Sequence, residues 1–347
     1  MNRHPRWALV RPPVTPLVSI LIPAYNAEQW IAETVRSALA QTWQPIEIIV
    51  IDDGSTDRTL QRARSFESNG VCVVAQNHSG AAAARNTAYA LSHGDYIQWL
   101  DADDLLAPDK ITRQIAARSG SRLLSSPWGR FLHRYERAEF ISTALWSDLS
   151  PTEWLLLSMG DDLFMHPASW LVSRELTEAA GPWDTTLSLD DDGEYFCRVL
   201  LASVGTRFVP EARSYYRMSG VTRLSYIGRS ETKRESLWRS MQLHIAYLRS
   251  LEDSERVRAA CLRYLQDRLM HFYPERLDIV GQAEQIARDL GENLHVPQLS
   301  WKYSWIEALF GWAVAKHVQR LLPQIKWSLA STWDKALFYK LSLYPRF

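Results

Sequence analysis

Long apolar runs, clustered cysteines and an excess of one charge sign are all missing from this chain of 347 residues. No window of about 18 or more apolar residues occurs, so we expect no transmembrane helix. The N-terminal residues 1–16 lack the apolar core of a signal peptide. The three cysteines (Cys72, Cys197 and Cys261) are too scattered for a disulfide framework or a zinc site, which predicts a reducing, cytoplasmic location.

The charge balance excludes little else. The 39 basic residues equal the 39 acidic ones, so overall charge favours no nucleic-acid partner. The apolar fraction of 46% is ordinary for a globular protein. The length is sufficient for one large domain, or for one domain with a helical extension.

Apolar runs alternate with helical patterns over the first 120 residues. Buried strands are expected at 17–22, 46–51, 71–75 and 96–100, the first ending at Pro23. Asn26 and Ser55 are expected to cap the intervening helices, and a third helix is expected at 81–92. Strands without a polar face are typical of a parallel sheet covered on both sides. The predicted fold class is therefore α/β, with a mostly parallel central sheet flanked by helices.

The alternation weakens beyond residue 120. Further strands are expected at 122–129, 168–173 and 206–220, and an acidic segment at 188–203 runs into a helix. From about residue 230 the pattern is helical. We therefore expect an N-terminal tail (1–16), a catalytic domain (17–228, with halves 17–120 and 121–228) and an α-helical C-terminal region (229–347).

Carboxylates follow two of the predicted strands. Asp52 and Asp53 come after one strand, and Asp101 and Asp103, which flank Ala102, come after another. Ligands bind beyond the carboxyl ends of such strands, and paired carboxylates suit Mg²⁺ or Mn²⁺ when substrate phosphates complete the coordination. The alternative is that this acidic turn is simply solvated.

Asp53 and Arg85 are further candidates for ligand binding. At a sheet crevice, the Asp53 carboxylate can accept hydrogen bonds from a base or ribose, whereas Ser55 and Asp57 are expected to be structural. Arg85 lies in "SGAAAARNTA", a helix start that favours an anion. Its guanidinium can bind a phosphate or carboxylate of a ligand, or it can pair with one of the aspartates as part of the scaffold, and both interpretations stay open.

The segments "VSILIPAYNAEQWIAETVRSALAQTW", "IIVIDDGSTDRT", "GAAAARNTA" and "YIQWLDADDLLAPDK", in this order and spacing, closely resemble the family 2 glycosyltransferases of the GT-A fold. The resemblance implies a nucleotide-diphosphate-sugar donor, with a UDP-sugar favoured. By position, the residues Pro23, Ala24, Tyr25 and Asn26 would line the nucleobase pocket and Asp53 would bond the base. Asp101 and Ala102 would face the ribose or diphosphate, and Asp103 would hold Mg²⁺ or Mn²⁺. The processive motif Q-x-x-R-W is absent, so one sugar per encounter is expected.

An inverting transfer needs a general base for the acceptor hydroxyl. Aligning Phe196 and Arg198 with the family's acceptor segment places Asp192 at the base position, with Asp191 as the second choice. Three consecutive aspartates also suit an ordinary helix N-terminus. Trp183 and the loop after Trp128 could stack on sugar faces, but aromatic side chains in a chain with 15 tryptophans more often belong to the core, and the core is the favoured interpretation. The resemblance places Tyr216, Arg217 and Arg223 near a loop that closes over the diphosphate.

The C-terminal residues 301–347 are basic and rich in tryptophan. They carry seven Lys or Arg against two acids, a net charge of +5. Such a segment can lie in a membrane interface, or it can pack on the catalytic domain or a second copy.

The expected function is an inverting, metal-dependent glycosyltransferase acting on a glycan or lipid-linked acceptor. A nucleotidyltransferase would need a Gly-rich, basic phosphate loop, which "IPAYNAEQW" lacks. An inactive sugar-nucleotide-binding scaffold is the other alternative.

Overall fold

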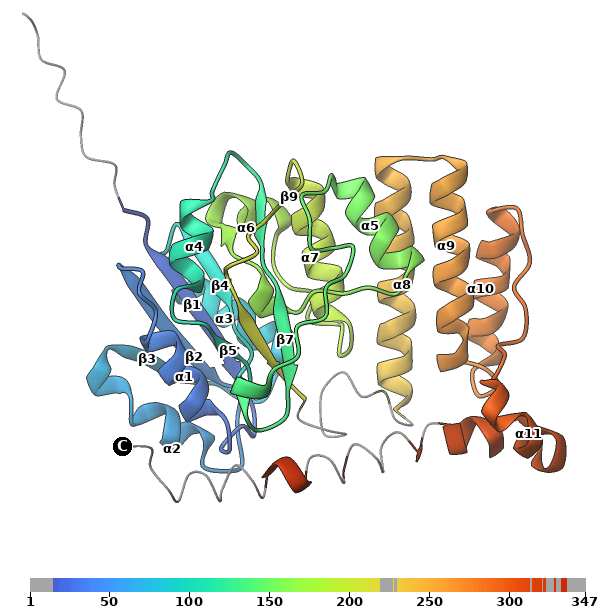
Figure 1. Ribbon diagram of the computed structural model, residues 1–347, viewed down its shortest axis with the longest axis horizontal. Helices are drawn as coiled ribbons and strands as arrows, with labels where there is room; N and C mark the ends of the chain where they lie inside the picture. The colour runs from blue at the N-terminus through green and yellow to red at the C-terminus, as the bar shows by residue number, and fades with distance from the viewer. Residues whose placement is uncertain are drawn as a thin grey trace, which may run out of the picture.

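The structure is a computed structural model that describes residues 15–218, 227, 230–312, 314–319, 321–322, 328 and 332–335. Its centre is a five-stranded sheet of order β3-β2-β1-β4-β8 (Figure 1). The strands are β1 (Val18–Ala24), β2 (Ile46–Asp52), β3 (Val71–Ala75), β4 (Tyr96–Trp99) and β8 (Val172–Ser173). β1 pairs in parallel with β2 and β4, β2 pairs in parallel with β3, and β8 runs antiparallel to β4.

Helices cover both faces of this sheet, as the apolar sequence of each strand requires. Ile20 and Ile22 point to a cluster that includes residues of α1 (Ile31–Leu39), α2 (Thr59–Arg64) and α4 (Lys110–Ala116). Leu21 and Ile49 point the other way, to α3 (Ala81–Leu91), α6 (Arg174–Ala180) and α7 (Asp191–Ala202). The prediction of an α/β fold with a mostly parallel sheet is confirmed.

Smaller sheets and more helices complete the structure. The strands β5 (Leu105–Leu106), β10 (Ser214–Arg217) and β7 (Trp128–Phe131) form one sheet, and β6 (Leu123–Ser125) with β9 (Thr206–Phe208) forms another. The remaining α-helices are α5 (Pro151–Gly160), α8 (Glu231–Leu251), α9 (Glu255–Arg268), α10 (Leu277–Asp289) and α11 (Ser304–Phe310). Short 3₁₀ turns occupy Glu67–Asn69, Tyr135–Arg137, Pro167–Ser169, Leu269–His271 and Trp301–Tyr303.

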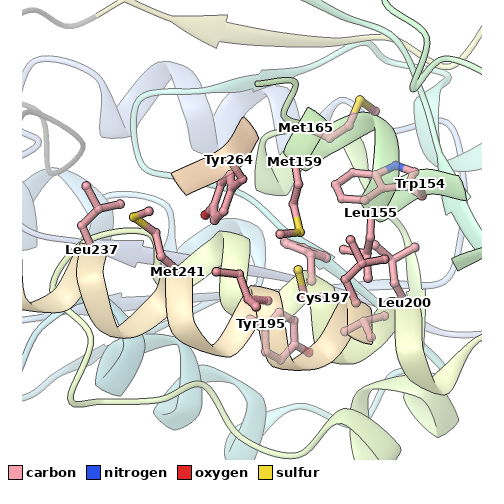
Figure 2. Packing of buried hydrophobic residues seen from close by; sticks show 14 of the residues in the cluster. Trp154, Leu155, Met159, Met165, Tyr195, Cys197, Leu200, Leu237, Met241 and Tyr264 are labelled. Carbon is pink, nitrogen blue, oxygen red and sulfur yellow. The ribbon is translucent and has the colours of Figure 1, made fainter. Parts of the chain in front are cut away.

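One hydrophobic core joins the sheet to the C-terminal helices. A single cluster of buried residues extends from Leu21 in β1 to Leu290 after α10. Figure 2 shows Tyr195, Cys197 and Leu200 of α7 among side chains of α5, α8 and α9. The predicted boundary near residue 228 therefore separates segments that share one core, and it stays a prediction.

Two helix starts and three strands differ from expectation. Asn26 and Ser55 do not cap helices, because α1 begins at Ile31 and α2 at Thr59. Instead the Asn26 Oδ1 accepts from the Thr56 N–H at 2.8 Å, and the Ser55 Oγ accepts from the Asn26 N–H at 3.0 Å. These bonds join the loops after β1 and β2. β1 continues through Pro23, only 172–173 of the strand expected at 168–173 forms, and the expected strand at 206–220 divides into β9 and β10.

None of the helices in the described residues combines the length and the apolar character needed to cross a bilayer.

Candidate functional site

The carboxyl ends of β1, β2 and β4 meet at one edge of the sheet. Pro23 and Ala24 are buried as the last residues of β1, whereas Tyr25 and Asn26 are exposed beyond it. Of the four residues predicted to line a nucleobase pocket, Tyr25 and Asn26 therefore present side chains to solvent. The Asn26 backbone is left-handed (φ 49°), which turns the chain sharply at this edge.

Asp53, directly after β2, is surrounded by hydrogen-bond donors. Its Oδ1 accepts from the Gln76 Nε2 at 2.7 Å and from the Ser79 N–H at 2.9 Å. Its Oδ2 accepts from the Gly80 N–H at 2.9 Å and lies 2.9 Å from the His78 Nδ1. The His78 ring also stacks on Tyr25 with the ring centroids 4.2 Å apart. His78 was not predicted from the sequence, because no motif in the chain points to this residue.

The three aspartates in the turn after β4 differ in their burial and in their partners. Asp104 is fully buried, where its Oδ1 accepts from the Arg217 N–H and its Oδ2 lies 2.9 Å from the His166 Nδ1. Burial, and then the nearby Asp101 charge, raise the pKa of Asp104 well above its ordinary value. Asp101, Ala102 and Asp103 precede it at the sheet edge, and Asp101 and Asp103 remain partly exposed. Asp104 thus anchors the turn and leaves Asp101 and Asp103 as candidates for ligand contact.

Arg217 holds the turn after β4 in place through hydrogen bonds. Its guanidinium donates to the Asp103 carbonyl at 2.7 Å and to Glu33 at 2.7 Å, and it lies between the Trp30 and Phe131 rings. The side chain is fully buried. The expectation that Tyr216 and Arg217 lie near a loop that closes over a diphosphate stays a prediction. Arg223 lies outside the described residues.

Arg85 joins two acidic segments that are far apart in the chain. Its Nη2 donates to Asp101 at 2.8 Å and its Nη1 donates to Asp191 at 2.7 Å, while the Trp183 ring covers its face. Burial opposes the charge, yet Asp101 and Asp191 together raise the pKa of Arg85. The scaffold interpretation thus describes the observed pairing. The predicted contact of Arg85 with a ligand stays a prediction.

Asp191 and Asp192 open α7 but differ in their surroundings. Asp191 is held by Arg85, whereas no described residue donates a hydrogen bond or forms an ion pair with the Asp192 carboxylate. Burial raises the pKa of Asp192 to about 7, and the adjacent Asp191 and Asp190 charges add to this. Burial also raises the pKa of Asp191, against the opposing effect of Arg85. Of the two carboxylates, Asp192 is the one with a pKa near neutrality and no bound cation.

The loop before α7 rests on a polar stripe of α8. The Ser236 Oγ accepts from the N–H groups of Ser188 and Leu189, each at 2.9 Å, and donates to the Leu189 carbonyl at 2.8 Å. One turn on, the Ser240 Oγ donates to Asp190 at 2.7 Å, where Asp190 has a left-handed backbone (φ 60°). Sequence reasoning missed this stripe, although serines four residues apart in an apolar helix face are a detectable signal.

Trp183 packs inside the fold. It is buried and stacks on Tyr195 with the ring centroids 4.0 Å apart and an interplanar angle of 8°. The favoured interpretation of Trp183 as a core residue is therefore confirmed. Its place beside Arg85 makes it part of the support for the acidic segments.

The carboxylates at this edge fit a metal ion whose other ligands are supplied by substrate phosphates. Among the described residues, no group of three or more His, Cys, Asp or Glu side chains is arranged to hold a metal. Mg²⁺ and Mn²⁺ do not need such a cage, because one or two carboxylates suffice when phosphates supply the other oxygens. Asp101 and Asp103 offer hard oxygen ligands in one turn, which matches that chemistry.

Comparison with known proteins finds that part of this chain is similar to glycosyltransferases. Residues 19–178 match the model described as "Glycosyl transferase family 2". WfaP of Escherichia coli, a UDP-Glc:α-D-GlcNAc-diphosphoundecaprenol β-1,3-glucosyltransferase, is 38% identical over 138 residues, covering 40% of this chain and 53% of WfaP. Escherichia coli chondroitin synthase is 46% identical over 98 residues, 28% of this chain and 14% of the synthase. The chain thus spans about half or less of the length of these relatives.

A solved structure supports the fold over a longer range. The structure of S. aureus TarS 1-349 in complex with UDP-GlcNAc superposes with a TM-score of 0.60, at 17% identity, covering 79% of this chain and 80% of that one. The sheet with its flanking helices matches the GT-A type of fold.

Proposed function

We propose, from the match of residues 19–178 to the model of glycosyl transferase family 2, that the protein transfers one sugar from a nucleotide-diphosphate sugar to a glycan or lipid-linked acceptor, with inversion. The observation that carries the proposal is the gathering of Asp101, Asp191 and Asp192 around Arg85 at the carboxyl edge of the sheet. Arg85 and Asp191, which are 106 positions apart in the chain, meet there, as a site between a donor and an acceptor requires.

We assign the donor to the edge formed by Tyr25, Asn26 and Asp53. The base would lie against Tyr25 and bond to Asp53, and the ribose and diphosphate would extend toward Asp101, Ala102 and Asp103. A divalent ion held by Asp103 would neutralise negative charge on the diphosphate. A UDP-sugar is the favoured donor, since relatives and structural neighbours carry that nucleotide in their names.

We assign the general base to Asp192. A base works best when its pKa lies near the working pH, and the pKa of Asp192 is raised to about 7. Its carboxylate would take the proton of the acceptor hydroxyl as the oxygen attacks the anomeric carbon and the nucleoside diphosphate leaves. Asp191, paired with Arg85, would keep the segment aligned with Asp101.

Calorimetric titration tests the donor assignment. The full chain is titrated with UDP, GDP and dTDP, each with Mn²⁺ and with EDTA, and the titrations are repeated with Asp103→Ala. Metal-dependent binding of one nucleotide that is lost in the variant supports the assignment. A folded protein that binds none of them would exclude the proposed activity, and binding without turnover on lipid-linked or glycan acceptors would favour an inactive scaffold.

We also propose that the C-terminal segment contacts the cytoplasmic face of a membrane. Trp301, Trp305 and Leu309 follow one another at four-residue spacing and are 79%, 60% and 70% exposed, with Phe310 beside them, while Ile306 packs inward. Residues 301–347 carry a net charge of +5, which leaves 32 basic against 37 acidic residues in the rest of the chain. An apolar stripe on a basic segment fits an anionic lipid surface, where a lipid-linked acceptor would be found.

Vesicle flotation tests this contact. The full chain should float with vesicles containing anionic lipid at low salt and should float less with neutral vesicles. Replacing Trp301 and Trp305 by serine should reduce flotation several-fold. Failure to float with either kind of vesicle would refute the membrane contact, and dimerisation lost in the same variant would assign the stripe to a second copy.

A further inference from the structure

We infer that His78 occupies the place of the nucleobase in the ligand-free protein, so that the donor must displace its imidazole ring to bind. The inference rests on the proposed function, which assigns the base to Tyr25 and Asp53. It adds that one side chain of this chain competes for both contacts.

The two contacts of the His78 ring are those proposed for the base. The ring stacks on Tyr25 with centroids 4.2 Å apart and an interplanar angle of 22°. Its Nδ1 lies 2.9 Å from the Asp53 Oδ2 and 3.1 Å from the Asp53 carbonyl oxygen. Both partners only accept hydrogen bonds, so the Nδ1 carries the proton. A flat ring with an N–H pointing at Asp53 is also what a nucleobase would present.

Asp53 has no acceptor position left for another donor while His78 stays. A carboxylate offers about four lone-pair positions, and Gln76, Ser79, Gly80 and His78 each use one. Two of the four donors are backbone N–H groups that lead into α3. Of the two side chains, His78 is 56% exposed and belongs to the surface, so it is the donor that an incoming base can replace.

The exchange requires rotation of a side chain and leaves the loop in place. Gly54 has a left-handed backbone (φ 71°), and a Cβ built on it would lie 2.8 Å from the His78 backbone nitrogen. The backbone at His78 is therefore packed directly against the turn after β2. The Ser79 and Gly80 N–H groups then stay on Asp53 when the imidazole ring leaves.

Replacement of an N–H donor selects among bases. The freed position on Asp53 accepts a hydrogen bond, which the ring N–H of uracil, thymine or guanine can supply. The corresponding ring nitrogen of cytosine is an acceptor and would face the carboxylate with two lone pairs opposed. We therefore expect UDP to bind more tightly than CDP.

Two measurements on the full chain test the inference. In ligand-free protein the NMR signals of the His78 ring protons, assigned by their absence in His78→Ala, should be displaced by the Tyr25 ring and should move toward free-histidine positions when UDP saturates the site. In calorimetry, His78→Ala should bind UDP about threefold to tenfold more tightly than the parent, which corresponds to removal of one competing hydrogen bond. CDP should bind more weakly than UDP to both proteins.

His93→Ala is the matched control. His93 is a more exposed histidine beside another carboxylate, Glu47, away from this edge, and its loss should leave UDP affinity unchanged. Unchanged or weaker UDP binding by His78→Ala, or ring signals that do not move at saturation, would overturn the inference while the donor site stands. Absence of nucleotide binding in both parent and variant would instead refute the proposed function, and this inference with it.

Discussion

At the scale of single residues, the roles of neighbouring acids follow from their partners. Asp104 is buried against His166 and Arg217, and Asp101 and Asp191 share Arg85, whereas none of the described residues places a cation on Asp192. A sequence of acids after a strand does not distinguish these cases. The distinction depends on side chains that come from segments as distant as residues 166 and 217.

Asp192→Asn should lower turnover about 10²- to 10⁴-fold, the usual contribution of a general base. The amide has a similar shape but cannot accept the proton, so UDP affinity should change little. Initial rates and calorimetry on the same preparation check both. Asp191→Asn is the comparison: it breaks the Arg85 ion pair and should weaken stability as well as rate. Equal rates for Asp192→Asn and the parent would remove Asp192 from the base position.

The raised pKa of Asp192 predicts the direction of the pH dependence. The base must be ionised, so the rate should fall as pH decreases through about 7. Asp190→Asn removes one of the charges that raise this pKa and should move the acid limb to lower pH. Profiles of kcat/KM between pH 5 and 9 measure the shift. If the acid limb of the folded Asp190→Asn variant stays at the same pH as that of the parent, the limb reports a group other than Asp192.

The same raised pKa also affects stability. The carboxyl holds its proton more strongly in the folded protein than in the unfolded chain, so the stability it contributes is present at low pH and is lost as pH rises through about 7. Asp192→Asn removes this loss. The variant should therefore gain melting temperature over the parent at pH 8 and little at pH 5, and a gain that is equal at both pH values would contradict the assignment.

At the scale of elements, α8 links the helical region to the loop that carries Asp192. Ser236→Ala leaves two N–H groups and one carbonyl without their partner, which should cost about 1–3 kcal/mol of unfolding free energy. Urea unfolding measures the change. Ser250→Ala on the same helix is the control, since that hydroxyl is exposed and bonds only to the Tyr247 carbonyl. If α8 does not stabilise the loop before α7, Ser236→Ala and Ser250→Ala should have the same free energy of unfolding.

The sequence predicted elements better than their ends. Apolar patterns located β1 to β4 and α3. The strands were easy to find because a strand that is buried on both faces consists almost entirely of apolar residues. The prediction failed at Asn26 and Ser55, because the Asn26 side chain accepts from the Thr56 N–H and the Ser55 side chain accepts from the Asn26 N–H across two loops. The choice between a local cap and a long-range bond depends on the approach of the loops, which no local pattern encodes.

The site was predictable to a similar degree. The strand-end aspartates were located by their position after apolar runs, and the family resemblance gave them roles. The buried position of Arg217 was not predicted, since an arginine between two aromatic rings looks the same in sequence as an exposed one. The contact of Arg217 with Trp30 exists only once the second half of the chain packs on the first.

At the scale of the whole molecule, the C-terminal region contacts the catalytic part at both of its ends. α8 and α9 contribute to the core around α7 (Figure 2), and Asp334 accepts hydrogen bonds from the His133 N–H at 3.0 Å and the Arg134 Nε at 2.7 Å. The hydrogen bond between His133 and Asp334 joins residues 201 positions apart in the chain. Removal of the region in two steps should separate its contributions.

A chain ending at residue 228 should fail to fold stably, because Tyr195, Cys197 and Leu200 of α7 would lose the apolar side chains of α8 and α9 that bury them. A chain ending at residue 300 keeps those helices and should retain cooperative unfolding and nucleotide binding, while losing flotation with anionic vesicles. Circular dichroism melts, calorimetry and flotation on the two truncations provide the comparison. If the chain of 228 residues is stable and binds nucleotide, the boundary near residue 228 is a true domain boundary. In that case α8 is not needed to stabilise α7.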